Sequence, residues 1–184
     1  MIRSFLLKLF FEQETKMNFI KNFRWVGLLL MIAAISAVLT AILEDITGTD
    51  QGLPGTLFIL WFFCNTFGML GLVIFYFSSG SKPAGWINLI GLAVFYIMSR
   101  TGRVELGFGL GFILFAAAAA LGREMPGWVT AAWLLAGITV FAYQILPQSG
   151  VLSYFNAWFL GLGLATFVTG LVVWKKVNPG PIAA

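Results

Sequence analysis

The chain has 184 residues, of which 60% are apolar, 16% aromatic and only 10% charged, and its net charge at pH 7 is +4. Soluble domains carry about 25% charged residues, and one of this length buries only about 70% of the surface of its unfolded chain. Because so much apolar surface would face water, the composition excludes a soluble globular protein. It predicts an all-α, polytopic membrane protein built as one helix bundle.

The sequence contains no histidine and a single cysteine, Cys64. Without histidine the chain cannot use imidazole haem ligation, histidine-based zinc sites or Ser-His-Asp catalysis. No P-loop, Rossmann fingerprint, nucleophile elbow or zinc-protease motif is present. The basic residues flank apolar runs and form no patch with interleaved aromatics. We therefore expect no catalytic residue, no metal, no cofactor and no nucleic-acid partner.

The first segment, residues 1–24, carries five basic residues and has apolar residues at three- and four-residue spacing. This pattern is typical of an amphipathic helix that lies in the membrane interface. Lys8 interrupts the only apolar stretch of the segment, which disfavours a signal peptide. Met17 is an alternative first residue, and the sequence leaves open which methionine starts the chain.

Six apolar runs follow, each long enough or nearly long enough to cross about 30 Å of hydrocarbon as a helix. Their ranges are 25–43, 53–77, 85–99, 104–121, 127–146 and 154–174. The third run has only fifteen residues, which is about 22 Å of helix, and needs tilt or snorkelling of Lys82 and Arg100 to cross. We predict a six-helix transmembrane bundle over residues 25–174 and a cytoplasmic tail over residues 175–184.

Arg100 and Arg103 separate the third and fourth runs. If the two runs formed one continuous helix, both arginines would lie near the middle of the bilayer, at a cost of roughly 5 to 7 kcal/mol. A turn at residues 99–103 avoids this cost, and Gly102 favours it.

The distribution of basic residues predicts the topology. With the amino terminus inside, nine lysines and arginines lie on the cytoplasmic side and only two lie outside. An odd number of helices would place the two basic ends on opposite sides and remove this bias. We expect six helices in a bacterial inner membrane, with both ends in the cytoplasm.

Three of the runs share a Leu-Gly-x-x-x-Phe pattern, at residues 70–75, 110–115 and 162–167. The pattern indicates three helical hairpins of the same orientation. The alternative is chance, because leucine, glycine and phenylalanine are abundant and the spacings of 40 and 52 residues are unequal. Glycines in membrane helices allow close backbone approach. The predicted helix-packing residues are Gly71, Gly107, Gly109, Gly111 and Gly163, and the fourth helix is the expected centre of the bundle.

Polar residues inside apolar runs are the first candidates for a binding site, because they are costly in a membrane. Asn65 and Thr66 lie midway along the second run, and Gln144 lies near the end of the fifth. They are candidate ligand contacts, and the alternative for Asn65 is an interhelical hydrogen bond worth about 0.6 kcal/mol. Asn88 lies close to a predicted helix end, where we expect it to reach interface water.

The outer loops hold the densest set of charges, which includes Glu44, Asp45, Arg100 and Arg103. If the two loops meet, these side chains would line a site for a polar ligand. The alternative is a pair of solvated loops whose charges contribute little energy.

The sequence leaves three functions open. The first hypothesis is a small-molecule transport or binding protein, with Asn65 and Gln144 as polar contacts in an apolar pocket. The second is a non-catalytic structural or accessory subunit of a larger membrane complex, which would dock on membrane-protein partners or on a second copy. The third, an interfacial lipid-modifying enzyme, would need the charged outer loops as its site. No carboxylate lies deep in an apolar run, which disfavours proton-coupled transport.

Overall fold

The computed structural model of the chain describes residues 23–122, 124–143 and 154–177. These residues form six α-helices, with no strand among them, so the all-helical prediction is confirmed. The helices are α2 (Arg24–Thr47), α3 (Leu53–Ser78), α4 (Lys82–Arg100), α5 (Val104–Leu121), α6 (Gly127–Tyr143) and α7 (Tyr154–Val177). Most of the predicted interfacial segment, residues 1–22, lies outside the described residues, as do Gln144 and the tail from residue 178.

Among the described residues, three helices are long and apolar enough to span a membrane, and they cover Arg24–Thr47, Leu53–Ser78 and Phe159–Lys176. The apolar parts of α5 and α6 are shorter, at Leu106–Leu121 and Gly127–Phe141. The composition and these three helices mark the chain as a membrane protein.

Several helix ends differ from the predicted ranges. Helix α4 begins at Lys82 and has 19 residues, because Pro83 lies in its first turn, where the missing N–H is not needed. Helix α2 continues to Thr47 and ends at Gly48, whose φ of 64° is the left-handed conformation common after a helix. The predicted turn between α4 and α5 is present, and Gly102 adopts a φ of 76° in it.

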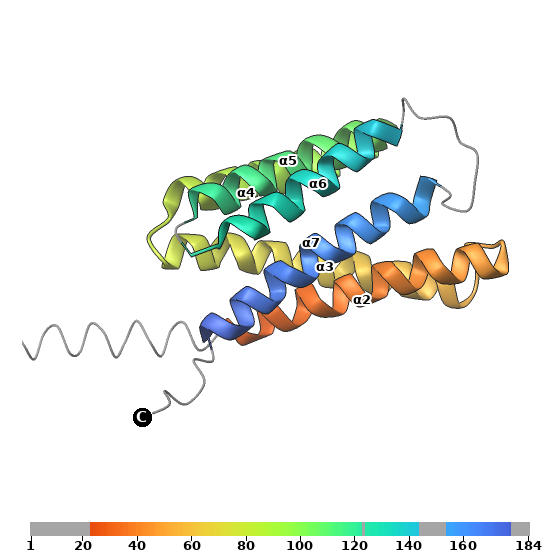
Figure 1. Cartoon of the computed structure of the whole chain (residues 1–184), viewed down its shortest axis with the longest axis horizontal. Coiled ribbons are helices and arrows are strands. Elements are labelled where there is room, and N and C mark those ends of the chain that lie inside the picture. The colour runs from red at the N-terminus through yellow and green to blue at the C-terminus, as the bar shows by residue number, and fades with distance from the viewer. Residues whose placement is uncertain (1–22, 123, 144–153, 178–184) are drawn as a thin grey trace, which may run out of the picture.

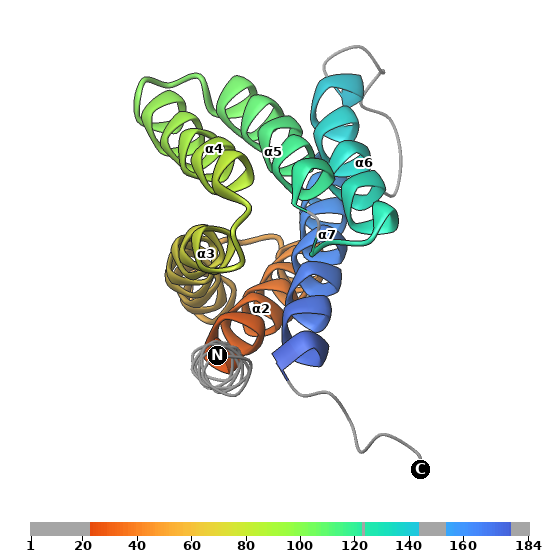
Figure 2. The same ribbon diagram turned by 90° about the vertical axis from the view of Figure 1, so that its left-hand side faces the viewer.

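Each helix packs on its neighbours in the chain, and α7 closes the ring through an extensive contact with α2. Seen end-on, the bundle has two layers, with α4, α5 and α6 above α3, α2 and α7 (Figure 2). The first turn of α2 and the last turn of α7 lie at the same end of the bundle (Figure 1). Helix α5, the expected centre, lies in the middle of one layer, and α2 has the same position in the other.

Glycines bring helix backbones together at three interfaces. A Cβ atom built on Gly170 of α7 would lie 2.7 Å from the carbonyl oxygen of Gly27 in α2. A Cβ on Gly111 would lie 3.3 Å from the carbonyl oxygen of Gly91, between α5 and α4. The third contact joins Gly137 of α6 to the backbone of α5. Small residues allow such close packing in membrane helices, where burial of apolar surface does not drive association.

The glycines of the repeated pattern do not have equivalent contacts. Gly71 and Gly111 face the preceding helix of their own hairpin, at Val26 and Phe95 respectively, whereas Gly163 faces Val38 of α2 in another hairpin. The difference arises because the ring of helices closes between α7 and α2. The two remaining predicted packing residues face different neighbours: Gly107 lies against Met98 of α4, and Gly109 lies against Phe141 of α6.

Aromatic side chains fill the space between the two layers. Trp61 of α3, Phe112 of α5, Trp133 of α6 and Phe159 of α7 are all buried. The ring centroid of Trp61 lies 5.3 Å from that of Phe159 in its own layer and 6.5 Å from that of Phe108 of α5 in the other layer, and the centroids of Phe112 and Trp133 lie 5.6 Å apart. Such edge-to-face and tilted contacts are favourable beyond the area they bury. The centre of the bundle is therefore a packed aromatic layer.

Candidate functional site

An apolar groove of about 400 Å³ lies between α2 and α7. Helix α2 contributes Ala34, Ile35, Val38 and Leu39, and helix α7 contributes Leu160, Gly163, Leu164 and Phe167. The groove opens on the outside of the bundle, because Ile35 is 53% exposed and Leu164 is 52% exposed. It is midway along α2, which runs from Arg24 to Thr47.

The groove exists because its floor has almost no side chains. Ala34 is buried, and a Cβ atom on Gly163 would lie 2.7 Å from Cγ2 of Val38 and 3.3 Å from the carbonyl oxygen of Ala34. The two backbones therefore form the floor, and the branched side chains on either side form the walls. Ligand pockets commonly enclose roughly 300 to 1,000 Å³, so the groove has the size of a small one.

The apolar lining limits what the groove can do. None of the eight lining residues that the structure describes has a polar side chain, so binding there depends on dispersion and on exclusion from water. The groove can hold a hydrocarbon chain or another apolar group. It has no side chain that could act as a nucleophile, an acid or a base.

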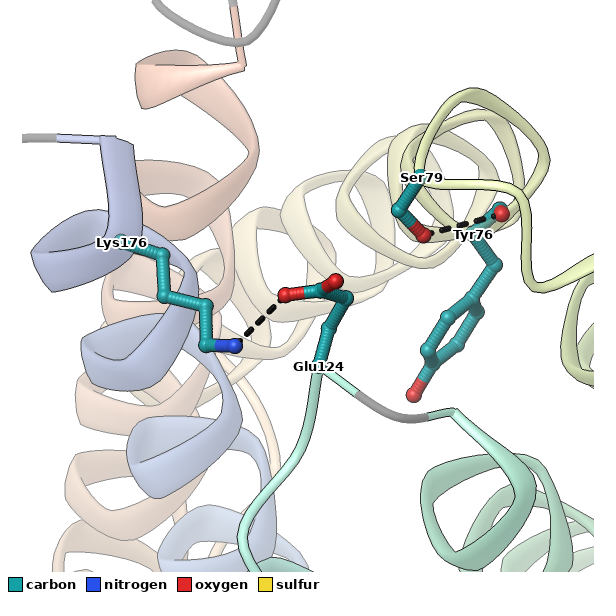
Figure 3. Close-up of polar contacts among 4 residues, drawn as sticks. All are labelled: Tyr76, Ser79, Glu124 and Lys176. Carbon is teal, nitrogen blue, oxygen red and sulfur yellow. Dashed lines mark hydrogen bonds and ion pairs between the residues drawn. The ribbon is translucent and has the colours of Figure 1, made fainter.

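One end of the α2–α7 interface is basic. The guanidinium carbon of Arg24 in α2 lies 5.1 Å from the centre of the Trp174 ring in α7, a cation–π contact that joins the two helices. Lys175 is exposed in the last turn of α7. The next residue, Lys176, extends toward the carboxylate of Glu124, with 2.6 Å between Nζ and Oε2 (Figure 3).

Tyr76 lies near this ion pair and connects α3 to the linker between α5 and α6. Its ring is buried, and a Cβ atom on Gly122 would lie only 2.5 Å from its Cε1 atom. Its carbonyl oxygen accepts a hydrogen bond of 3.0 Å from the Ser79 hydroxyl (Figure 3). This end of the bundle is thus held by close packing as well as by charge.

The charged residues predicted on the outer side lie at the opposite end. Glu44 and Asp45 are in the last turn of α2, and Arg100 and Arg103 flank the turn between α4 and α5. Within the described residues, no ion pair links these acidic and basic side chains. The same part of the chain holds no group of three or more side chains that would bind a metal ion.

Asn65 and Thr66, predicted as neighbouring ligand contacts, point in different directions. Asn65 is 2% exposed, and its Oδ1 atom has no hydrogen-bond partner among the residues that the structure describes. The Thr66 hydroxyl donates to the carbonyl oxygen of Phe62 at 2.6 Å and also pairs with the Tyr96 hydroxyl of α4. Thr66 therefore links α3 to α4, and only Asn65 faces the core.

Asn88 is buried instead of reaching interface water as expected. It lies two turns into α4, because that helix begins at Lys82, and its Nδ2 donates to the carbonyl oxygen of Met69 at 3.2 Å. A second interhelical bond runs from Nε1 of Trp133 to the Thr169 hydroxyl at 2.9 Å. No sequence pattern indicated the hydrogen-bond partner of Asn88 or of Trp133.

Comparison with known proteins adds no candidate function or site. No protein family, curated protein or solved structure matches the chain.

Proposed function

We propose that the chain is a six-span protein of the bacterial inner membrane, with both ends in the cytoplasm, that binds a small apolar molecule in the groove between α2 and α7. The observation that carries the proposal is the open groove itself, which has a volume of about 400 Å³ and is lined by apolar side chains alone among the described residues. A molecule with a hydrocarbon part would fit this lining, because it would give up no hydrogen bond on binding.

The lengths of the remaining helices support six spans. Helix α4 has 19 residues, with Lys82 and Arg100 at its two ends, and the apolar parts of α5 and α6 cover Leu106–Leu121 and Gly127–Phe141. At 1.5 Å per residue these lengths are about 28, 24 and 22 Å. With local thinning of the bilayer and snorkelling of flanking residues, they cross about 30 Å of hydrocarbon. A cysteine-accessibility map, with single cysteines at residues 50, 79 and 101 in a Cys64→Ser background, tests the topology. We expect labelling from outside at residues 50 and 101 only.

The packed core supports binding over transport through the centre of the bundle. Trp61, Phe112, Trp133 and Phe159 fill the space between the layers. A polar substrate would have to cross this layer without hydrogen-bonding partners, which is costly. The groove, in contrast, opens sideways, where an apolar ligand would enter from the membrane.

The second candidate function is that of a non-catalytic accessory subunit in a larger membrane complex. The open walls of the groove favour it, because bulky side chains of a partner helix also dock into apolar grooves. The third function, a lipid-modifying enzyme, has less support because no ion pair joins the charged outer loops among the residues that the structure describes.

Photolabelling tests the proposed function. The purified full chain would be reconstituted in lipid nanodiscs with a diazirine-bearing fatty acid, irradiated and analysed by peptide mass spectrometry. We expect labels on the groove residues of α2 and α7. Leu164→Trp, which fills the groove, should reduce the labelling by about tenfold, equivalent to about 1.4 kcal/mol of binding free energy.

The matched control is Leu135→Trp in α6, a leucine with similar exposure, 54% against 52%. This variant should label like the unmodified chain. Equal labelling of all exposed helix faces would contradict the proposal. A stoichiometric membrane protein that crosslinks to the groove would support the accessory-subunit function instead.

A further inference from the structure

We propose that the groove holds an acyl chain of an anionic phospholipid from the cytoplasmic leaflet, and that the lipid phosphate binds Arg24 and Lys175. This inference rests on the proposed function and names the ligand class. Charge complementarity at one end of the α2–α7 interface carries it.

A continuous apolar surface leads from the basic end to the groove. On α2, Arg24, Leu28, Met31 and Ile35 lie on one helix face, because they are spaced by four, three and four residues. The eleven helical steps from Arg24 to Ile35 span about 16 Å, close to half of the roughly 30 Å hydrocarbon thickness. A lipid with its phosphate beside Arg24 would therefore reach the groove with its acyl chain.

Helix α7 has the same arrangement on its side of the interface. Phe167, Leu171 and Lys175 follow one another at four-residue spacing, which places them on one face. Phe167 lines the groove, and Lys175 is exposed at the basic end. The two helices thus present one cation each above a shared apolar path.

The two cations are available to an anion. In the described part of the chain neither Arg24 nor Lys175 forms an ion pair, whereas Lys176 is paired with Glu124. The Arg24 guanidinium is held over the Trp174 ring, which restricts its position, and the Arg24 side chain is exposed. Guanidinium groups bind phosphate through two parallel hydrogen bonds, and tryptophan favours the membrane interface.

The charges at the opposite end determine which leaflet supplies the lipid. The groove lies midway along α2, so its distance from the two membrane leaflets does not determine which leaflet supplies the acyl chain. Glu44 and Asp45 occupy the far end of α2, where they would repel a phosphate group. The basic end is the one that attracts an anionic headgroup, and in the proposed topology it faces the cytoplasm, where anionic lipids give the surface a negative potential.

Lipid retention measured by native mass spectrometry tests the inference. The full chain in detergent would be titrated with phosphatidylglycerol and with phosphatidylcholine that have identical acyl chains. We expect about tenfold tighter binding of phosphatidylglycerol. The double variant Arg24→Gln/Lys175→Gln should reduce this preference to near unity, and Arg24→Lys should retain most of it. The matched control, Arg100→Gln/Arg103→Gln, also removes two charges but should leave the preference unchanged.

Leu164→Trp separates this inference from the proposed function. It should weaken binding of both lipids. If both lipids bind equally to the unmodified chain and Leu164→Trp weakens both, the headgroup inference is wrong and groove binding stands. If Leu164→Trp affects neither lipid, both proposals are wrong. A melting temperature equal to that of the unmodified chain, measured without added lipid, shows that each variant is folded.

Discussion

Gly27 of α2 and Gly170 of α7 pack backbone to backbone. A Cβ atom built on either glycine would lie 2.7 Å from the carbonyl oxygen of the other, and real Cβ atoms essentially never come so close to another atom. Neither neighbour is a flexible side-chain end that can rotate away. The distance between the first and the last described helix is therefore fixed by the absence of two methyl groups.

Gly170→Ala should destabilise the bundle. Overpacking of a tight interface costs about 1 to 3 kcal/mol, which exceeds the intrinsic gain of up to about 1 kcal/mol from alanine in a helix. Thermal unfolding in detergent, followed by intrinsic tryptophan fluorescence, would measure the loss. Gly127→Ala is the control, because a Cβ there meets nothing within 4 Å. Equal melting temperatures for the two variants would show that the helices separate at little cost.

Thr166 and Thr169, one turn apart on α7, should respond differently to replacement by valine. Both are buried, but Thr169 accepts the bond from Trp133, whereas the Thr166 hydroxyl has no partner in the described part of the chain. Thr169→Val leaves the indole N–H buried without a partner, at a cost of roughly 1 to 3 kcal/mol.

Thr166→Val removes an unpaired hydroxyl, so the free energy of unfolding should stay the same or rise. Unfolding in a denaturing detergent, with both variants at matched lipid content, would provide the comparison. A cost for Thr166→Val equal to that for Thr169→Val would mean that an ordered water or a ligand pairs with the Thr166 hydroxyl.

The bond between Thr66 and Tyr96 should couple α3 to α4 by a modest free energy. Polar interactions between membrane helices average about 0.6 kcal/mol and reach about 1.7 kcal/mol in double-mutant cycles. A cycle of Thr66→Val, Tyr96→Phe and the double variant isolates this energy from the local bond of Thr66 to Phe62. Additive effects of the two substitutions on unfolding would show that the pair contributes nothing.

At the basic end, packing should matter more than charge. Gly122→Ala forces a new methyl group against the buried Tyr76 ring, so we expect a loss of about 1 to 3 kcal/mol. Lys176→Gln breaks an ion pair whose side chains are 37% and 35% exposed, and such pairs contribute at most about 1 kcal/mol. Unfolding at low and high salt would separate the two effects, because only the ion pair is screened. A larger loss for Lys176→Gln would reverse this ranking.

The positions of the helices were predictable because charged residues, glycines and prolines separate the apolar runs. The start of α4 was not, because the predicted range followed the apolar residues alone and left out Lys82 and Pro83, although proline is favoured in a first turn. The different directions of Asn65 and Thr66 follow from the rotation of about 100° between adjacent helix residues. The side chains that Asn65 and Thr66 contact depend on which helices are neighbours, and no local sequence pattern indicates which helices these are.

The groove could not be predicted from the sequence. Its floor combines Ala34 and Gly163, which are far apart in the chain and meet only because α7 packs on α2. Gly163 was expected to pack against a helix, but the pattern did not identify the helix. Small residues beside branched apolar ones occur on many lipid-facing surfaces, so the local pattern does not mark a groove.

The closure of the ring between α2 and α7 has a consequence for the order of biosynthesis. Helix α7 is the last of the six to be synthesised, yet it is a main partner of α2, the first. Until α7 inserts, the face of α2 around Gly27 has no protein partner from this interface and must be solvated by lipid or shielded by an insertion factor. Assembly therefore ends with a long-range contact, and a ribosome stalled before α7 would hold an open, incomplete bundle in the membrane.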